Sequence, residues 1–266
     1  AHVKTVGIQT TEKMPRRVTL VARGTPGHGS RPTLENAVVI LANAVSKAGS
    51  WDTEVRFNET TRTYFQRMAE ISGAEDAYRY NNVENLDESD AIQQHFLENF
   101  PYHYSISRSS VAPTVIDAGF RRNVIPSEAS AMLDIRMLPD ESVEDFYAKL
   151  AAVIDDPRVE IIPEKIYRPA APPSEIDNEM FQTLERVAVD MYPKATVLPL
   201  MATGATDMSQ VRAKGMQCYG IGPARSVEEI SSGFGAHGDN ERIAEDAFIS
   251  LVEYLWNVVI EVAAAK

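Results

Sequence analysis

The order of strand-like and helix-like segments between residues 16 and 168 constrains the fold of this chain more than any other feature. Apolar residues that alternate with polar ones predict strands, and apolar residues that recur every three or four positions predict helices. In chain order the predicted elements are a strand over 16–24, a helix over 34–48, strands over 114–120 and 129–138, a helix over 142–154 and a strand over 158–167. This split βαββαβ order predicts a four-stranded antiparallel sheet with two helices on one face.

Local signals mark the ends of these elements. Pro32 and Thr33 are expected to start the first helix, and the Ser142 hydroxyl is expected to cap the second. Residues 123–128 are predicted to form the turn of a hairpin between the two central strands. Residues at about 50–110 are acidic and have a helical pattern, so we interpret them as a helical insert within the βαββαβ unit.

A proline-rich run at 169–175 (PAAPPSE) predicts a domain boundary. The predicted elements outside the βαββαβ unit are a strand over 2–10, a helix over 177–192, a strand over 195–204, a short helix over 207–215 that ends at Gly215, a strand over 216–223 and a helix over 240–265. Alternating helices and strands indicate an α/β layer.

Charge and cysteine content exclude several classes of protein. Asp and Glu total 38 against 26 Lys and Arg, a net charge of -12, and the basic residues are scattered, which argues against a nucleic-acid partner. No apolar run approaches the roughly 20 residues of a membrane span, and residues 1–20 lack a signal-peptide pattern. The single cysteine, Cys218, rules out an internal disulfide and is expected to be a buried, unreactive thiol.

A glycine-rich loop, GTPGHGSRP at 24–32, lies between the first strand and the first helix. Gly24, Gly29 and Ser30 have the spacing of a phosphate-binding loop, but the lysine that would reach the phosphates is missing. The flanking glycines are expected to leave His28 exposed. His28 is therefore either a turn histidine or a hydrogen-bond donor to a developing oxyanion.

A second histidine, His237, lies in a glycine-rich loop before the closing helix, in SSGFGAHGDNERI. It is either a metal ligand, with a nearby carboxylate to orient its ring, or a surface histidine beside a helix cap. Two further groups imitate metal motifs without following an apolar strand: the pair Glu228–Glu229, and His237 with Asp239. One histidine alone does not make a catalytic zinc site, which needs about three protein ligands.

Three more polar residues are candidates for substrate contacts. Arg212 follows a Gly/Thr turn on the predicted short helix, and its planar guanidinium is suited to a carboxylate, although a solvated helix arginine is the alternative. Asn123 and Arg136 flank the hairpin turn, where Asn123 is also a turn former and Arg136 also a cross-strand charge. No G-x-S-x-G motif supports a serine hydrolase.

Taken together and in this order, four segments resemble the zinc-dependent aminoacylase and carboxypeptidase family: VTLVARGTPGHGSRPTLENAV, AGFRRNVIPSEASAMLDIRMLP, TGATDMSQVRAKG with YGIGP, and AHGDNERI. The family includes acetylornithine deacetylase, succinyl-diaminopimelate desuccinylase, glutamate carboxypeptidase and carboxypeptidase S, and the last segment is most similar to the carboxypeptidase S branch. The resemblance implies a ferredoxin-like βαββαβ lid, through which two subunits pair, inserted into an α/β catalytic domain that holds two zinc ions.

The resemblance also implies roles for individual residues. His237 is similar to the C-terminal zinc ligand, and His28 to the lid histidine that reaches the partner's active site and stabilises the oxyanion. Asn123 is similar to the substrate-contacting asparagine of the NVIP turn. The remaining implied substrate-binding positions are Arg136 and Arg212 at the substrate carboxylate and Gly204, Ala205 and Thr206 in the lining turn.

Family members carry an H-x-D motif, a bridging Asp, a Glu-Glu pair and a further acidic ligand ahead of the lid, and these do not appear here. The resemblance makes 1–15 the last strand of the N-terminal catalytic half, 16–168 the lid and 169–266 the C-terminal part of the catalytic domain. Three explanations are open: the chain is a fragment, its upstream part is a separate chain, or the gene is truncated. We favour a fragment, which is expected not to assemble two zinc ions by itself. Whether the protein is cytoplasmic, or instead periplasmic or secreted, is expected to depend on the missing N-terminal part.

The function implied by the resemblance is metal-dependent hydrolysis of an amide or peptide bond next to a free carboxylate, in a small peptide or an N-acyl amino acid. A non-catalytic dimerisation and binding module that uses the edge of the lid sheet is the alternative hypothesis. A small-ligand regulatory domain is a more distant alternative, and it does not account for the motifs at Arg212 and His237.

Overall fold

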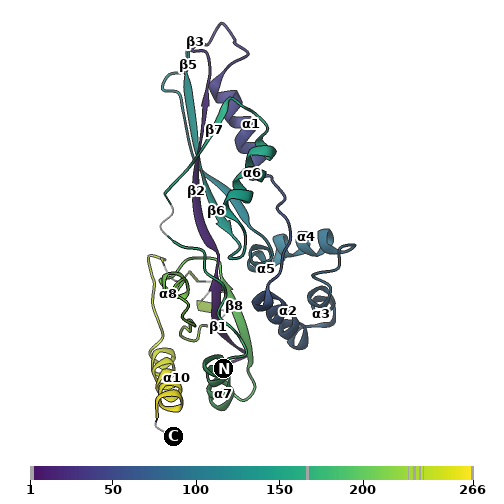
Figure 1. Ribbon diagram of the computed structural model, residues 1–266, viewed down its shortest axis with the longest axis vertical. Coiled ribbons are helices and arrows are strands. Elements are labelled where there is room, and N and C mark those ends of the chain that lie inside the picture. The colour runs from purple at the N-terminus through teal and green to yellow at the C-terminus, as the bar shows by residue number, and fades with distance from the viewer. Residues whose placement is uncertain are drawn as a thin grey trace.

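The computed structural model describes residues 3–165, 168–226, 228–229, 232–233, 235 and 237–264. The molecule is elongated (Figure 1). A four-stranded sheet with two helices, which we call the lid, forms one end, and a two-stranded sheet with the C-terminal helices forms the other. Four further helices lie beside the junction. This mixed α/β architecture confirms the predicted fold class.

The lid has the predicted βαββαβ topology. Its four antiparallel strands lie in the order β4-β6-β2-β7, and two helices cover one face of the sheet. The lid elements are β2 (Met14–Arg23), α1 (Ala37–Gly49), β4 (Ser110–Ala118), β6 (Glu128–Met137), α6 (Val143–Ile154) and β7 (Val159–Pro163).

The core of the lid follows from the period of two along β6. Ala131, Leu133 and Ile135 are buried against the helices, and the residues between them are partly exposed on the other face. Phe146 and Leu150 of α6 pack into the same cluster. Because each buried side chain of this size contributes roughly 1.5–3 kcal/mol, a shift of one residue in register would be strongly unfavourable.

Helix caps show where local prediction succeeds and where it fails. The Ser142 hydroxyl accepts the Asp145 N–H at 3.1 Å, which confirms the predicted cap of α6. The predicted start of α1 at Pro32 is wrong, because Asn36 is the cap. The residues before Asn36 stay in the loop, where the Glu35 carbonyl accepts a backbone hydrogen bond from the opposite side of the loop.

The predicted turn at 123–128 contains a short strand. β5 (Val124–Ile125) pairs antiparallel with β3 (Gly27–His28), which the sequence analysis placed in a loop. The hairpin between β4 and β6 therefore folds over the glycine-rich loop instead of reversing tightly, and the two loops form the outer tip of the lid (Figure 1).

The insert at about 50–110 is helical, as predicted. Its elements are α2 (Glu59–Ile71), α3 (Ala74–Asn81), α4 (Ser89–Asn99) and α5 (Pro101–Ile106). Their aromatic core extends onto the far sheet, since Leu198 and Met201 belong to the same buried cluster. The Tyr102 hydroxyl donates to the Met201 carbonyl at 3.0 Å, so the insert contacts both ends of the molecule.

A short stem joins the insert to the lid. Val55 and Arg108 form an antiparallel bridge, and the Thr53 hydroxyl donates to the Ser109 carbonyl at 2.5 Å. The chain therefore leaves and re-enters the lid at nearly the same place.

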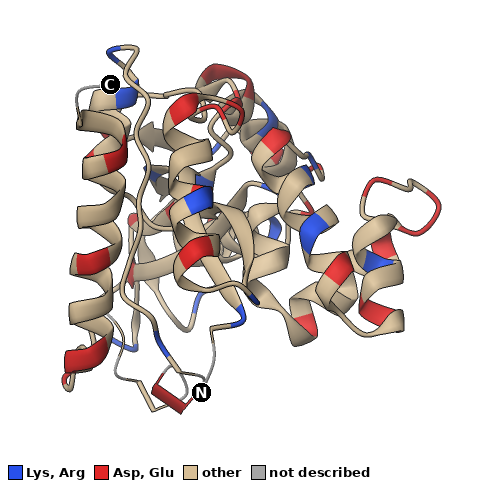
Figure 2. Ribbon diagram, turned by 90° about the horizontal axis from the view of Figure 1, so that it is seen from below, with Lys and Arg blue, Asp and Glu red and all other residues tan. Residues whose placement is uncertain are grey.

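The second sheet pairs β1 (Thr5–Glu12) in parallel with β8 (Thr196–Ala202). Around it lie α7 (Glu179–Met191), α8 (Met208–Arg212) and α10 (Glu245–Ala263). α10 begins five residues later than predicted, and its charged residues are all acidic (Figure 2). Within the described ranges, none of the helices combines the length and the apolar character needed to cross a membrane.

Two predictions for the segment after α8 are wrong. The strand expected over 216–223 is reduced to a single bridge, in which Gly220 and Gln9 exchange backbone hydrogen bonds of 2.7 and 2.9 Å. Cys218 is partly exposed instead of buried, because the apolar run around it pairs with the sheet only at Gly220. The preceding helix ends at Arg212, three residues before the predicted end at Gly215, and a turn that closes at Gly215, with a left-handed φ of 86°, follows it.

Lys13 lies between the two sheets and has no exposed surface. Its Nζ donates to the Ser105 and Arg108 carbonyls, at 2.8 Å each, and to the Ser110 hydroxyl at 3.3 Å. The ammonium therefore joins the end of the insert to the junction of the sheets. Burial lowers the pKa of Lys13 to about 7, and the nearby Arg136 charge adds to this effect.

This pKa predicts how stability depends on pH. Above pH 7 the folded chain has released the Lys13 proton, whereas the unfolded chain keeps it up to its ordinary pKa near 10.5. The unfolded state then binds more protons, so the Lys13 contribution to the free energy of unfolding rises with pH between 7 and 10, by roughly 1 kcal/mol per unit. Urea unfolding of wild type and Lys13→Met at pH 7, 8.5 and 10 measures it.

We expect the free-energy difference between Lys13→Met and wild type to grow over that range. Lys149→Met, which changes an exposed lysine on α6, is the matched control and should follow wild type. Parallel curves for wild type and Lys13→Met would contradict the prediction.

Candidate functional site

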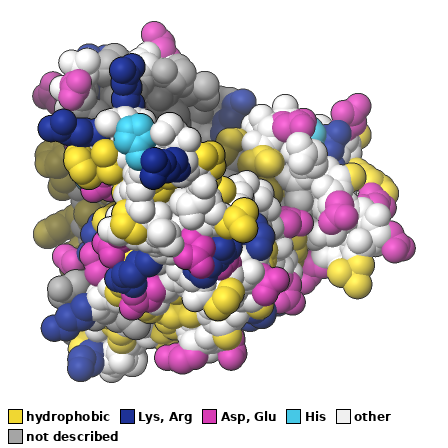
Figure 3. All heavy atoms as spheres, turned by 90° about the horizontal axis from the view of Figure 1, so that it is seen from above, with side chains coloured by type: hydrophobic (Ala, Val, Ile, Leu, Met, Phe, Trp, Pro, Cys, Tyr) yellow, Lys and Arg dark blue, Asp and Glu magenta, His cyan; other side chains and the backbone are white. Residues whose placement is uncertain are grey.

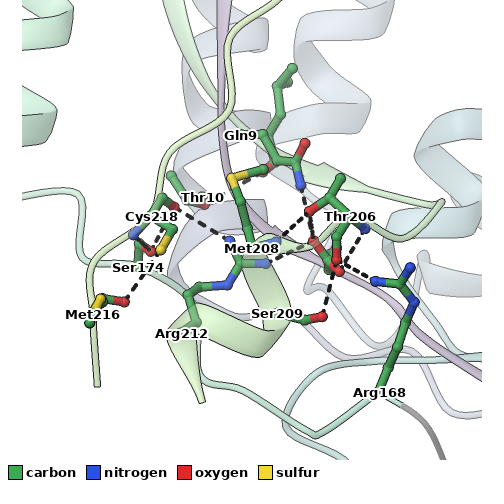
Figure 4. Close-up of polar contacts among 12 residues, drawn as sticks. Gln9, Thr10, Arg168, Ser174, Thr206, Met208, Ser209, Arg212, Met216 and Cys218 are labelled. Atoms are coloured by element: carbon green, nitrogen blue, oxygen red, sulfur yellow. Dashed lines mark hydrogen bonds and ion pairs between the residues drawn. The ribbon is translucent and has the colours of Figure 1, made fainter. Parts of the chain in front are cut away.

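A buried carboxylate at the end of β1 organises the first group of candidate residues (Figure 4). Glu12 accepts the Thr206 backbone N–H at 2.9 Å and the Thr206 hydroxyl, and it forms an ion pair with the Arg212 Nη2 at 2.9 Å. β1, the turn after β8 and α8 are therefore joined through one side chain. Neither Glu12 nor Lys13 was among the predicted site residues.

Arg212 is 3% exposed, so the alternative of a solvated helix arginine is wrong. Its Nη1 makes only a long contact of 3.4 Å to the Cys218 carbonyl, and its Nε is buried without a hydrogen-bond partner. Since a buried donor without a partner is costly, the guanidinium has unused capacity to bind an acceptor. A small pocket between Arg212, Glu12 and Arg168 lies at this place.

The predicted lining turn lies beside this pair. Gly204 is exposed, and Ala205 and Thr206 are partly exposed. The Thr206 carbonyl accepts from the Ser209 hydroxyl at 3.2 Å and from the Arg168 guanidinium. The structure thus brings the turn and Arg212 together, through contacts to the intervening Glu12.

The second group is at the tip of the lid. His28 and Val124 are paired residues of β3 and β5, and the Gly29 N–H donates to the Asn123 carbonyl at 2.8 Å. Both His28 and Asn123 are exposed. The structure therefore places these two predicted residues side by side, on loops that are far apart in the sequence.

Ser30 determines which nitrogen of His28 faces outward as a donor. The Ser30 backbone N–H donates to His28 Nδ1 at 3.2 Å, and the Ser30 hydroxyl lies 2.7 Å from the same atom. A ring nitrogen that accepts a backbone N–H carries no proton in the neutral imidazole. The contact therefore favours the tautomer with the proton on Nε2, which leaves an Nε2–H donor at the exposed end of the ring.

Arg136 and His237 make their polar contacts with residues outside both groups. Arg136, on β6, forms a bidentate pair with Asp134, with distances of 2.8 and 2.9 Å, so its charge pairs within its own strand. His237 is exposed, has a left-handed φ of 68°, and donates its backbone N–H to Glu241 Oε2 at 3.1 Å.

Metal-binding capacity is limited in the part of the chain that the structure describes. Those residues contain no group of three or more His, Cys, Asp or Glu side chains that could hold a metal ion. His237 can supply one ligand at most, and a catalytic zinc site needs about three. The described residues therefore do not form a complete metal site.

A family model described as a peptidase dimerisation domain, M20_dimer, matches residues 10–161. The chain belongs to the M20 peptidase family. The match covers the lid, its insert and the end of β1, which is the part of the molecule that carries the βαββαβ topology.

Curated M20 relatives align along nearly the whole chain. The probable carboxypeptidase S-like 2 of Dictyostelium discoideum is 28% identical over 97% of this chain and 48% of its own length. The N-fatty-acyl-amino acid synthase/hydrolase PM20D1 of Xenopus tropicalis is 29% identical over 93% of this chain and 48% of its own length. The chain thus spans about half the length of these relatives.

A solved structure supports the fold. The M20 family metallo-carboxypeptidase Sso-CP2 from Sulfolobus solfataricus superposes with a TM-score of 0.64 at 16% identity, covering 97% of this chain and 61% of that one. At this identity the similarity establishes the fold and not the substrate.

Proposed function

We propose that the protein containing this chain hydrolyses an amide bond next to a free carboxylate, in a small peptide or an N-acyl amino acid. The observation that carries the proposal is the alignment of more than nine-tenths of the chain with relatives named as a carboxypeptidase and an N-fatty-acyl-amino acid hydrolase. Membership of the M20 family supports it.

The lid tip suits transition-state stabilisation. The exposed Nε2–H of His28 is a fixed donor for the oxyanion that forms when water attacks an amide carbonyl. Asn123, held against the same loop, would contact the substrate beside it.

The second group suits binding of the substrate carboxylate. Arg212 retains unpaired Nε and weakly used Nη1 donors beside the 204–206 turn. Arg136 would assist from the lid, although its pairing with Asp134 must loosen first.

The proposed active site needs a partner subunit, because β3, which contains His28, lies at the outer tip of the lid and α8, which contains Arg212, lies on the far side of the junction (Figure 1). We propose a homodimer in which the lid tip of one subunit reaches the site of the other. β4 supports lid pairing: it is an edge strand with six consecutive exposed residues, including Val115 and Ile116.

Residues 169–266 would form the C-terminal part of the catalytic domain. α10 supports this assignment, because one long face of the helix carries large apolar side chains that are exposed. An exposed apolar face of this kind is typical of a surface that packs against further protein. Its exposed residues are Phe248, Ile249, Val252, Leu255, Trp256, Val259, Ile260 and Val262.

Metal content tests the proposal. Two zinc ions would supply the acidified water for hydrolysis, with His237 as one ligand and the others from outside these 266 residues. We expect the product of the complete reading frame to bind about two zinc ions and hydrolyse N-acyl amino acids, and the 266-residue chain to bind fewer than two.

Elemental analysis after dialysis, together with a hydrolysis assay, measures both quantities. Two tightly bound zinc ions in the 266-residue chain would contradict the proposed ligand set. A complete product that dimerises but neither binds zinc nor hydrolyses these substrates would favour the non-catalytic dimerisation and binding module.

A further inference from the structure

The lid tip carries three arginines that the proposed mechanism does not use. Arg31 follows His28 in the same turn, with its backbone N–H on the His28 carbonyl at 2.8 Å, and Arg121 and Arg122 directly precede Asn123. All three are exposed. Their guanidinium groups have no ion pair or hydrogen bond to any residue that the structure describes.

The absence of partners distinguishes these arginines from most exposed arginines elsewhere in the described residues. In a chain with 38 acidic and 26 basic residues, carboxylate partners are plentiful. Exposed arginines that do pair include Arg17 with Glu164, Arg23 with Glu160, Arg62 with Glu84, Arg158 with Asp156 and Arg186 with Glu261.

Three carboxylates, Glu35, Asp117 and Glu128, lie next to the tip loops, against four arginines when Arg23 is counted with the three above. Glu35 accepts the Thr25 hydroxyl at 2.8 Å, and Glu128 pairs with Arg23 at 3.1 Å. The tip therefore keeps a net positive charge in an acidic protein.

Backbone contacts place the segments that carry these arginines next to the His28 turn. A Cβ placed on Gly29 would lie 3.5 Å from the Arg122 carbonyl oxygen, so the His28 turn is in contact with the Arg122–Asn123 segment. Viewed onto this end, a histidine side chain lies next to basic and apolar side chains (Figure 3). The apolar ones on these two loops include Leu34 and Phe120, which are 98% and 76% exposed.

We propose that Arg31, Arg121 and Arg122 form an anion-binding collar that selects substrates with a second carboxylate, such as N-acyl derivatives of acidic amino acids. This rests on the proposed function. Arg212 and Arg136 already account for the main-chain carboxylate, so additional positive charge beside the oxyanion donor favours a dianionic substrate. Guanidinium groups bind carboxylates in a bidentate manner, and the attraction strengthens when the lid tip is enclosed by the partner subunit.

A substrate pair of nearly equal size tests the collar. In the product of the complete reading frame, we expect kcat/KM for N-acetyl-L-glutamate to exceed that for N-acetyl-L-glutamine. The double variant Arg121→Gln, Arg122→Gln should lower this ratio roughly tenfold, because it removes charge that only the second carboxylate uses. Arg17→Gln removes an exposed, paired arginine from β2 of the lid sheet and should leave the kcat/KM ratio unchanged.

Binding to the 266-residue chain provides a test that does not need hydrolysis. In NMR titrations, N-acetyl-L-glutamate should shift the His28 imidazole and Asn123 amide signals more than N-acetyl-L-glutamine does, and the double variant should abolish the difference. Because the groups are exposed, added salt should weaken it as well.

Equal shifts with the two ligands, together with an unchanged kcat/KM ratio in the double variant, would overturn the collar. Weaker dimerisation of the double variant with an unchanged ratio would also overturn it, and would assign the arginines to an acidic surface of a second copy. If the collar binds the dianion but the complete product hydrolyses neither substrate, the proposed function fails and the collar does not.

Discussion

His28→Ala should lower the turnover number of the complete protein by about 10²–10³-fold and change its stability little. The loss is large because a fixed donor to an oxyanion acts mainly in the transition state. The stability effect is small because the side chain is exposed and, among the described residues, its hydrogen bonds are to Ser30 alone. Steady-state hydrolysis of an N-acyl amino acid and thermal unfolding measure the two effects. His28→Gln, which keeps an N–H donor, should retain part of the activity.

His95→Ala is the matched control, since it removes a histidine from α4 in the insert and should leave turnover unchanged. Nitrogen chemical shifts of His28 in the 266-residue chain give an independent reading, because the contact with Ser30 favours the Nε2–H tautomer. Wild-type turnover in His28→Ala, or a predominant Nδ1–H tautomer, would contradict the oxyanion role.

Mixed dimers test whether the histidine acts on the partner. Consider a dimer of one His28→Ala subunit and one His237→Ala subunit. If His28 acts in the partner's site, the site of the His28→Ala subunit has both histidines intact. If His28 acts in its own subunit, neither site has both. We therefore expect activity to return when the two inactive variants are mixed and allowed to exchange subunits. No return of activity, with exchange demonstrated, would show that each subunit uses its own His28.

Glu12→Gln should destabilise the 266-residue chain by about 3–5 kcal/mol, because it leaves the Arg212 charge buried without its partner. It also weakens the two hydrogen bonds from Thr206. The double variant Glu12→Gln, Arg212→Met should recover part of the loss, since no unpaired charge remains. Chemical denaturation of the single and double variants measures both values.

The matched control is Glu261→Gln, which breaks the ion pair between α10 and Arg186. Both partners of that pair are more than one-third exposed, so its loss should cost less than about 1 kcal/mol. A Glu12→Gln chain as stable as wild type would show that the buried pair is not the connection between β1 and α8 that we describe.

The pair also shows what sequence reasoning could not reach. Glu12 and Arg212 are 200 residues apart in the chain, and the sequence around either residue does not predict contact with the other. Glu12 and Lys13 are charged residues at the end of a strand, where exposure is the ordinary expectation. Their burial arises from packing between the two sheets and the insert, which no local periodicity encodes.

Local patterns were sufficient where local physics decides. The alternation along β6, the Ser142 cap and the helical insert were predicted because each depends on residues within about one turn or strand. The prediction of a strand over 216–223 failed because an apolar run becomes a strand only if it pairs with a neighbouring strand over several residues. Here it pairs with β1 only through the bridge between Gly220 and Gln9. The glycine loop predicted an exposed His28, but not its pairing with Val124.

The stem at Val55 and Arg108 has a consequence for how members of this family can differ. Because the chain departs from and returns to the lid at one point, some fifty residues can be gained, lost or replaced there while α1 and β4 stay in place. Descendants of a common ancestor can therefore diverge in the insert, which packs against β8, while the lid surface that we propose for subunit pairing is inherited unchanged.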